Sequence, residues 1–543
     1  MGRRAVADAL NELAFCAELL GDARVDPKGC SGIAWAMRSI EVEGSDLLSA
    51  LLRLPDMTPR LAAVVDDALA DRSSPFVDEL KRQLPAGLFA MRRLKGLGPK
   101  KIQKLWTELG IESLGELEYA CKENRLITLD GFGEKTQAVL MEQMATAQSE
   151  SGLMRRDQAE RLVSSFLETC ASSAGLSGLR AELAGDLRRG CELVADVVVV
   201  TTGPAPAEVA PRVRFVASVP AEMFGTALLL ATGSDTHLEA LRAHAKTKGL
   251  ELDTIKAKTD DDVYAALGLW PIAPEQREAA VVLVEVGKAR PQLVERKDLR
   301  GALHNHTTAS DGVNTLQEMA TAAGAWGLQW MGVSDHSASA VYAHGLDVAR
   351  LRAQQNDVVA VNKAGPVRVL TGVESDILKD GSLDYEDVDL LALDVVVASM
   401  HQRYGLKGDL LTARLVKAAL HRAVDVVGHP TGRLLLSRPA ADFDVSALLE
   451  ACQRSGCAIE LNANPARLDL AERWLREAKE RGVLVSIAAD AHAVDEFDNL
   501  HHGLALARRA GLRAEDVLNT RSVDEVMAWV KARRASHKQA SAA

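Results

Sequence analysis

The chain has 543 residues, of which 47% are hydrophobic and 26% are charged, and its formal net charge is -11. A chain of this length exceeds what one hydrophobic core supports, so we expect about three to five structural units. The negative balance excludes a protein that coats DNA through its overall charge. Any contact with nucleic acid therefore requires a local basic surface.

The cysteine and hydropathy patterns indicate in which cellular compartment the protein works. Seven cysteines are scattered without a C-x-x-C pair, which favours reduced thiols in a cytosol over a disulfide scaffold or a zinc finger. The first residues, MGRRAVADALNEL, lack the apolar core of a signal peptide, and the chain has no run of about 18 apolar residues. We expect a soluble cytoplasmic protein with no membrane partner.

Residues 1–150 place apolar side chains at helical spacing throughout. Within them, LKGLGPKKIQKLWTELGI at 94–111 is a helix-hairpin-helix signature, whose glycines permit a tight turn with backbone N–H groups facing a phosphate. Residues 91–104 carry six Lys or Arg and no acid, and LDGFGEKT supplies a second glycine pair. Ordinary helical hairpins are the alternative. The predicted DNA-binding residues are Gly96, Gly98, Lys100, Lys101, Gly131, Gly133 and Lys135.

The pattern changes to strands between 180 and 232, in LVADVVVVTT, VRFVASV and TALLLATG, and a small mixed segment follows at 235–290. From residue 302 to 492, seven short apolar runs alternate with segments long enough for a crossover helix. This alternation predicts a parallel sheet with right-handed connections. The final KARRASHKQASAA is expected to be a frayed tail.

Six of these seven runs end in a side chain that binds metals. The carboxyl ends of successive parallel strands face one shared basin, and imidazoles and carboxylates converging there suit Zn²⁺, Mn²⁺ or Fe²⁺. A single histidine at a strand end is more often structural, but agreement across six strands favours a metal site. The candidate ligands are His304, His306, Asp311, His336, Glu374, His401, His429, Asp490 and His492.

Nine ligands exceed the need of one ion, and three ions with Glu374 as a bridging carboxylate would use them. Metal ions lower the pKa of bound water, and a pair about 4 Å apart can hold the attacking and leaving oxygens of a phosphoryl displacement. Arg433 and Arg467 are candidates to neutralise the phosphodiester. We expect Glu374, His401, Asp490 and Arg433 to carry the catalysis.

The pattern HxH…D…DH…E…H…GHP…DxH resembles the PHP (polymerase and histidinol phosphatase) phosphoesterase superfamily over about residues 297–530. The resemblance implies a distorted, TIM-like (β/α)7 barrel with a trinuclear metal site. It implies one ion held by His304, His306, Glu374 and Asp490, a second held by Glu374, His401 and His429, and a third held by Asp311, His336 and His492.

The whole chain resembles a larger family. AGDLRRG, ATGS and YAALGLWPIAPEQRE precede the barrel in the order found in the bacterial family X DNA polymerases that carry a C-terminal PHP domain. The resemblance implies a multidomain α/β protein. The implied domains are an all-α lyase-like domain (1–85), a helix-hairpin-helix region (86–150), an α+β nucleotidyltransferase-like palm (151–234), a thumb-like domain with a linker (235–296) and the PHP domain (297–530).

The palm departs from that family at its catalytic positions. Asp186 replaces the serine of the glycine-rich turn, Val198 replaces the second catalytic aspartate, and we expect Phe215 at the third. Arg189 and Asp196 are what remains of the nucleotidyltransferase site. One carboxylate does not hold two Mg²⁺ ions, which need hard oxygen ligands in octahedral array. We predict no polymerase activity.

The first hairpin departs in the same way. In LPDMTPRLAAVV at 54–65, Asp56 and Thr58 stand in place of the hairpin glycines. Val64 stands where relatives with deoxyribose-phosphate lyase activity keep the Schiff-base lysine. A lyase of this kind needs an amine nucleophile, so we expect that activity to be absent.

Three functional hypotheses remain. We favour a monomeric, metal-dependent 3′–5′ exonuclease or 3′-end-processing phosphoesterase in DNA repair, which holds DNA through backbone contacts without reading its sequence. The second hypothesis is an active, gap-filling family X polymerase with exonuclease activity, and it requires a different strand register in the palm. The third is a PHP phosphatase of small phosphomonoesters, in which the front half is an interaction module.

Overall fold

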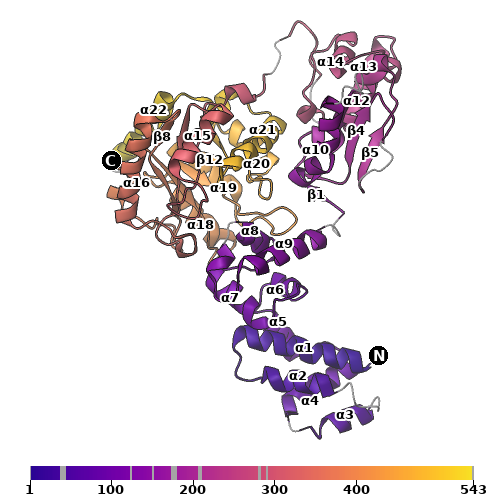
Figure 1. Cartoon of the computed structure of the whole chain (residues 1–543), viewed down its shortest axis with the longest axis vertical. Coiled ribbons are helices and arrows are strands. Elements are labelled where there is room, and N and C mark those ends of the chain that lie inside the picture. Colours follow the sequence, from indigo (N-terminus) through magenta and orange to yellow (C-terminus); the bar gives the residue numbers. More distant parts are fainter. Residues whose placement is uncertain are drawn as a thin grey trace. The chain divides into compact units, whose positions relative to one another are not determined.

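The computed structural model describes residues 2–36, 45–54, 56–122, 125–148, 152–172, 180–205, 211–278, 283–288 and 292–540. The chain forms two compact units, 1–147 and 148–543, coloured along the sequence in Figure 1. The division into five domains stays a prediction. Among the described residues, no helix is long and apolar enough to cross a lipid bilayer.

The described part of the first unit is entirely helical, as its apolar spacing predicts. Four helices carry a proline in the first turn, where its missing N–H costs no hydrogen bond. Leu10, Leu13, Leu88 and Ile102 are fully buried in the core. The helices are α1 (Gly2–Leu20), α2 (Pro27–Ala36), α3 (Ser45–Leu51), α4 (Pro59–Leu69), α5 (Pro75–Lys81), α6 (Ala86–Met91), α7 (Pro99–Leu109), α8 (Leu114–Lys122), η1 (Arg125–Thr128) and α9 (Glu134–Gln148).

Two glycine turns precede α7 and α9, at the predicted hairpins. Gly96 has a φ of 90° and Gly131 a φ of 89°, a backbone region that other residues rarely adopt. A side chain at Gly98 or Gly133 would meet no atom within 4 Å, so the backbone at these two positions faces open space. Both turns therefore leave room for a ligand against their backbone N–H groups.

The lysines of the two hairpins divide into exposed and packed side chains. Lys100 and Lys135 are exposed. Lys101 lies with its ammonium 5.2 Å from the centre of the Phe132 ring. Lys104 donates to the backbone carbonyl of Asp130 at 3.1 Å, which joins the first hairpin to the second. The exposed lysines are the ones available to contact a phosphate.

Residues 56–65, predicted to belong to a degenerate first hairpin, are part of the helical core. Thr58 caps α4, its hydroxyl accepting from the backbone N–H of Leu61 at 3.2 Å. Val64 is 1% exposed, and it packs in the same cluster as Leu10 and Leu88. A lysine at this position would bury its ammonium among apolar side chains, so the valine suits a structural helix.

The second unit begins with two small sheets and the helices that cover them. Strand β2 pairs antiparallel with β4, β4 pairs parallel with β5, and β1 pairs antiparallel with β3. The elements are β1 (Met154–Arg155), α10 (Arg156–Ser172), β2 (Ala181–Ala184), α11 (Gly185–Arg188), β3 (Leu193–Val194), β4 (Val197–Thr201), β5 (Val213–Val216), η4 (Ala221–Met223), α12 (Phe224–Thr232), α13 (Asp235–Thr247), η5 (Leu252–Thr254), α14 (Asp260–Ala266) and η6 (Pro274–Gln276).

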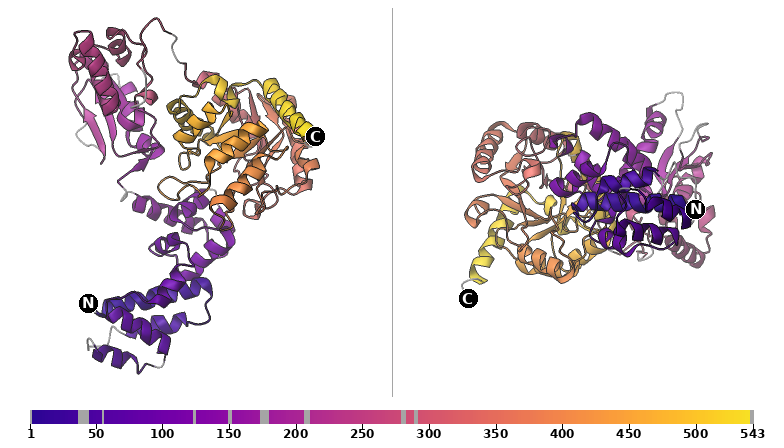
Figure 2. Two further views of the ribbon diagram at one scale, coloured as in Figure 1. Left: turned by 180° about the vertical axis from the view of Figure 1, so that it is seen from behind. Right: turned by 90° about the horizontal axis from the view of Figure 1, so that it is seen from below.

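The remainder of the second unit alternates parallel strands with helices that lie outside them (Figure 2). The sheet orders are β6-β7-β8 and β13-β12-β11-β10-β9. The bridges Asn305–Ala491 and His336–Glu374 connect the two sheets. The strands are β6 (Gly301–Ala302), β7 (Trp330–Gly332), β8 (Arg368–Leu370), β9 (Gly372–Asp376), β10 (Val395–Ser399), β11 (Val426–Gly428), β12 (Ala458–Asn462) and β13 (Val485–Ala488).

The helices of this region bury one face against the strands. Their main core contains Met331, Val373, Val427 and Ile459 from the strands together with apolar residues of the helices. The helices are η7 (Arg296–Asp298), α15 (Leu316–Trp326), η8 (Val341–Ala343), α16 (Val348–Ala364), α17 (Asp387–Leu390), α18 (Gly408–Ala419), α19 (Val445–Ser455), α20 (Glu472–Glu480), η9 (Val494–Asn499), α21 (Leu500–Arg509), η10 (Ala514–Asp516), η11 (Leu518–Thr520) and α22 (Val523–Ala540).

The C-terminal segment corrects one expectation, because α22 extends through most of the predicted tail to Ala540. Arg533 and Arg534 both pair with Asp425, whose side chain is fully buried. The contact between Arg533 and Asp425 is 2.6 Å long. A buried carboxylate needs such partners, and they order a helix that the polar composition of the tail does not predict.

Asn519 provides a stability prediction for the two parallel sheets, because it bonds to a strand of each. Its side chain donates to the carbonyls of Gly301 and Ile487 at 2.8 and 2.7 Å, and accepts from the N–H of Ile487 at 2.7 Å. Asn519→Ala leaves these buried groups without a partner, at about 1–3 kcal/mol each. We expect a lower melting temperature in calorimetry, whereas the exposed Asn356→Ala serves as the control. An unchanged transition in Asn519→Ala would contradict this role.

Candidate metal centre

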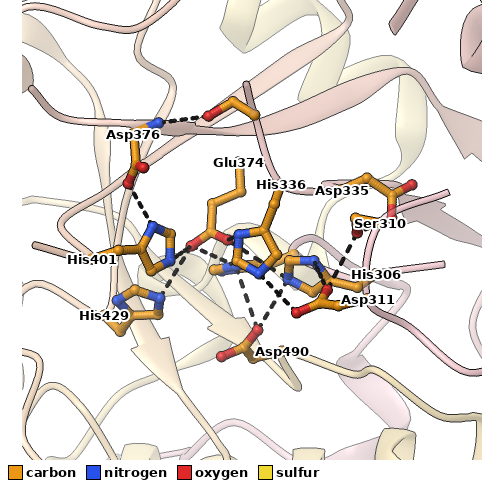
Figure 3. Close-up of polar contacts among 12 residues, drawn as sticks. His306, Ser310, Asp311, Asp335, His336, Glu374, Asp376, His401, His429 and Asp490 are labelled. Atoms are coloured by element: carbon orange, nitrogen blue, oxygen red, sulfur yellow. Dashed lines mark hydrogen bonds and ion pairs between the residues drawn. The ribbon is translucent and has the colours of Figure 1, made fainter. Parts of the chain in front are cut away.

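The nine predicted ligands lie in the parallel strands or in the loops that follow their carboxyl-terminal ends, and they converge on one buried cluster, most of which Figure 3 shows. All nine belong to groups whose ligand atoms lie within 4.8 Å of one another. The groups are His306, Asp311, His336 and His492; His304, His429 and Asp490; His304, His306 and Glu374; and His336, Glu374 and His401.

These groups overlap with the sets that the family resemblance implies, but they are not identical to them. The three residues of the implied third set lie in one group, and this group also contains His306. Glu374 and His401 share a group with His336 instead of His429. His429 lies in a group with His304 and Asp490. The residues are therefore brought together as expected, while their division among ions stays a prediction.

Glu374 is the centre of the cluster, and its side chain is fully buried. Its Oε1 lies 3.1 Å from Nε2 of His304, 3.1 Å from Nε2 of His429 and 3.2 Å from Nε2 of His401. Its Oε2 lies 2.9 Å from Nδ1 of His336. The two oxygens thus face imidazoles from different strands, an arrangement suited to a carboxylate that bridges two cations.

Several buried polar atoms of the cluster meet no hydrogen-bond partner within the chain. A buried polar atom without a partner costs about 1–3 kcal/mol, so folded proteins keep such atoms where another group completes them. Neutral imidazoles and carboxylates are the donor set of divalent transition metals. The atoms are Nε2 of His304, both ring nitrogens of His306, Nδ1 of His336, both carboxylate oxygens of Glu374 and Nδ1 of His429.

The charge states of the cluster follow from burial and from its neighbours. Burial and the nearby imidazoles of His492 and His336 lower the pKa of His306 to about 3, which keeps His306 in its neutral, metal-binding form. Burial opposes ionisation of Glu374, yet the imidazoles, led by His401, hold the pKa of this carboxyl well below its ordinary value. The carboxylate of Glu374 is therefore ionised and places a negative charge in the middle of the cluster.

The backbone is strained at three of the predicted ligands. His304 has a φ of 63°, Asp490 a φ of 52° and His429 a φ of 20°, all outside the regions that residues with a side chain prefer. Each lies one or two residues beyond the end of its strand. Strain of this kind persists where surrounding contacts enforce it, and it concentrates at ligand sites.

Two buried carboxylates that the sequence pattern did not single out hold ligand rings in place. Nδ1 of His304 donates to Glu460 at 2.6 Å, and Nδ1 of His401 donates to Asp376 at 2.6 Å. Each bond directs the opposite nitrogen, Nε2, toward Glu374. Asp376 follows Glu374 by two residues on the same strand, so strand alternation was the signal that could have found it.

The two arginines that were predicted to neutralise the phosphodiester differ in position. Arg433 donates to the carbonyls of Arg467 and Leu468, and to Glu192 at 2.7 Å, so its guanidinium is engaged outside the cluster. The side chain of Arg467 is 7% exposed, and its Nε lies 3.9 Å from a carboxylate oxygen of Asp490. Of these two arginines, Arg467 is the one beside the predicted ligands.

The palm residues lie apart from this cluster, in the β2-β4-β5 sheet and the turn beside it. Asp196 is exposed just before β4, and Val198 is buried within it. Arg214 of β5 lies opposite Val198 in the parallel register. Phe215, expected at the third aspartate position, packs with the apolar side chains of the other face. The side chain of β5 that shares a face with Val198 is therefore an arginine, and Phe215 lies on the opposite face.

The remaining palm residues are engaged in internal ion pairs. Arg189 pairs with Asp186, and it also donates to Glu278 at 2.9 Å. Arg188, its neighbour in the turn, donates to Asp260 at 2.7 Å. The cations that would face a triphosphate are thus partnered by carboxylates of the chain itself.

Comparisons with known proteins agree with this organisation. The DNA polymerase beta thumb model matches residues 227–278, and the PHP domain model matches residues 302–464. A probable phosphatase of Thermoanaerobacter sp. (strain X514) is 29% identical over 42% of this chain and 94% of its own length. The histidinol phosphate phosphatase (HISK) of Lactococcus lactis subsp. lactis Il1403, complexed with zinc, L-histidinol and phosphate, is 17% identical, covering 39% of this chain and 94% of its own, with a TM-score of 0.31.

The most extensive of these similarities covers the whole architecture. The DNA polymerase/3′-5′ exonuclease PolX of Bacillus subtilis (strain 168) is 31% identical, over 98% of this chain and the full length of the relative. In this chain the thumb match precedes the PHP match. The chain therefore belongs to the bacterial family X DNA polymerases that carry a C-terminal PHP domain.

Proposed function

We propose that the nine clustered side chains hold divalent metal ions, up to three of Mn²⁺, Zn²⁺ or Fe²⁺, and that the site hydrolyses phosphodiesters at DNA 3′ ends. The observation that supports this most directly is the set of buried nitrogen and oxygen atoms that converge without hydrogen-bond partners. The exonuclease named in the Bacillus subtilis relative supports the choice of reaction. The role would be end processing in DNA repair, by a cytoplasmic monomer.

Divalent ions in such a site activate water for attack and neutralise the charge of the phosphodiester. The residues of the chain would position them. Glu374 faces imidazoles of four strands and would bridge two ions. Glu460 and Asp376 accept from the rings of His304 and His401, which fixes the nitrogen that each ring presents. Arg467, beside Asp490, would contact a phosphate oxygen.

We propose that the first unit binds the DNA backbone. Gly96 and Gly131 place open turns before α7 and α9, where backbone N–H groups attract phosphate. Lys100 and Lys135 are exposed beside these turns. Contacts of this kind are made to the backbone and carry no sequence information. They favour DNA over the small phosphomonoester that the match to probable phosphatases brings into consideration.

We also propose that the palm has lost nucleotidyl transfer and the first unit its lyase activity. Asp196 is the one carboxylate left at the palm positions, with Val198 and Arg214 beside it on the sheet. An arginine at that place repels Mg²⁺, and Asp186 repels a triphosphate. Val64 is buried in the helical core and offers no amine.

Metal affinity tests the role of Glu460. Glu460→Gln keeps the size of the side chain but weakens its bond to His304, and loss of such an outer partner typically costs 10- to 100-fold in metal affinity. We expect a weakening on the order of 10-fold or more in calorimetric titration with Mn²⁺ or Zn²⁺. Glu450→Gln, on the exposed face of α19, is the matched control. Equal affinity in both variants would argue against the arrangement.

Nuclease assays test the reaction. We expect Mn²⁺-dependent release of nucleotides from the 3′ end of 5′-labelled single-stranded or gapped DNA, which a chelator abolishes. His401→Ala and Asp490→Asn remove candidate ligands, and each should lower the rate by at least about 100-fold, since metal-ion stabilisation is worth several kcal/mol. His421→Ala, outside the cluster, should stay active. Full turnover in both ligand variants would rule the mechanism out, and hydrolysis of small phosphomonoesters alone would favour a phosphatase.

Primer extension tests the loss of polymerase function. With a gapped primer–template, all four dNTPs and either Mg²⁺ or Mn²⁺, we expect no extension, because one carboxylate does not position two ions. The assay should use Asp490→Asn protein, so that 3′–5′ degradation does not hide synthesis. Extension that disappears on adding Asp196→Asn to this protein would show an active palm and contradict the proposal.

A further inference from the structure

Solvent reaches the metal centre unevenly. The side chains of His304 and Glu374 are fully buried, and that of His429 is 3% exposed. Those of His401 and His492 are more open, with 12% and 11% of their surface exposed. A substrate that meets the centre from solvent is therefore expected to pass beside one of these two rings, and His401 is the more exposed.

Tyr342 lies at this entrance. The centre of its ring is 6.4 Å from the ring centre of His401 and 6.1 Å from that of His336. The interplanar angles are 74° and 61°, so neither imidazole stacks flat on the tyrosine. Val341, the preceding residue, is 79% exposed, which places this turn at the protein surface. An apolar, aromatic turn thus borders a centre made of charged and polar groups.

The turn that carries Tyr342 is fixed to the metal centre. The hydroxyl of Ser339 lies between two carboxylates, 2.6 Å from an oxygen of Asp384 and 3.0 Å from an oxygen of Asp376, and its backbone N–H donates to Asp384 at 3.0 Å. Asp376 is the carboxylate that also accepts from the ring of His401. The same buried side chain therefore positions a predicted ligand and the turn with the aromatic ring. Tyr342 is held at a set place relative to the cluster, which a binding surface requires.

We propose that Tyr342 is a stacking platform for a nucleobase next to the scissile phosphate. The inference rests on the proposed function and deepens it, because it assigns the nucleoside part of the substrate to a residue. Bases of any sequence stack on aromatic rings, and this is how proteins hold single strands without reading them. A ring beside two of the candidate ligands is placed to meet the base of a nucleotide whose phosphate lies at the ions.

The test compares variants on matched DNA substrates. The substrates are a single-stranded oligonucleotide and two versions with a tetrahydrofuran abasic residue, one at the last and one at the penultimate position. The enzymes are the full-length chain, Tyr342→Ala and Tyr342→Phe, with Val341→Ala as the neighbouring control. Stacking on one base changes affinity by roughly 5- to 150-fold, so Tyr342→Ala should raise KM for normal DNA within this range. Tyr342→Phe keeps the ring and should behave as the unmodified chain.

The abasic substrates separate stacking from a structural role. On the substrate that lacks the stacked base, the unmodified chain should lose the same factor, and Tyr342→Ala should cause no further loss. A Tyr342→Ala defect of equal size on all three substrates would overturn the proposal, as would a defect of equal size in Tyr342→Phe. Absence of DNA hydrolysis by the unmodified chain, with metal bound, would instead refute the proposed function itself.

Discussion

A carboxylate buried among imidazoles is the constraint on which the parallel sheets of the second unit depend. Glu374 has no exposed surface and faces rings that come from four separate strand ends. A buried anion of this kind is costly unless cations compensate it, and these rings are its nearest partners. The strained backbone at His304 and Asp490 shows that the strands are shaped around the cluster as well as around their apolar core.

The same balance of charge recurs in the segment predicted to be the palm, where we propose that nucleotidyl transfer has been lost. Cations of its glycine-rich turn pair with carboxylates of the chain, Arg188 with Asp260 and Arg189 with Glu278. The positive charges of the turn are therefore compensated by these carboxylates without a bound triphosphate. Within the second unit, Glu192 pairs with Arg433 at 2.7 Å, so a residue next to this turn contacts the barrel. These ion pairs join the turn to other parts of the second unit.

The sequence predicts those features that depend on local spacing. The nine candidate ligands were found because each stands at or near the end of an apolar run. Glu460 was not, since a carboxylate inside a strand has no distinctive spacing, and Asp376 was missed although it follows Glu374 by two residues on the same strand. Phe215 was expected on the wrong face because a shift of one residue in register exchanges the two faces. The helix at Arg533 depends on Asp425, 108 residues away, which no local pattern indicates.

A cluster of imidazoles and carboxylates does not by itself select DNA, because it recognises only the phosphate that all phosphoesters share. Selection must come from groups that contact the rest of the substrate. In the first unit we propose the open glycine turns with the exposed Lys100 and Lys135, which suit a repeated backbone phosphate. Near the metal centre we propose the ring of Tyr342, which suits a base of any identity. Both kinds of contact would ignore sequence, as the proposed processing of DNA ends requires.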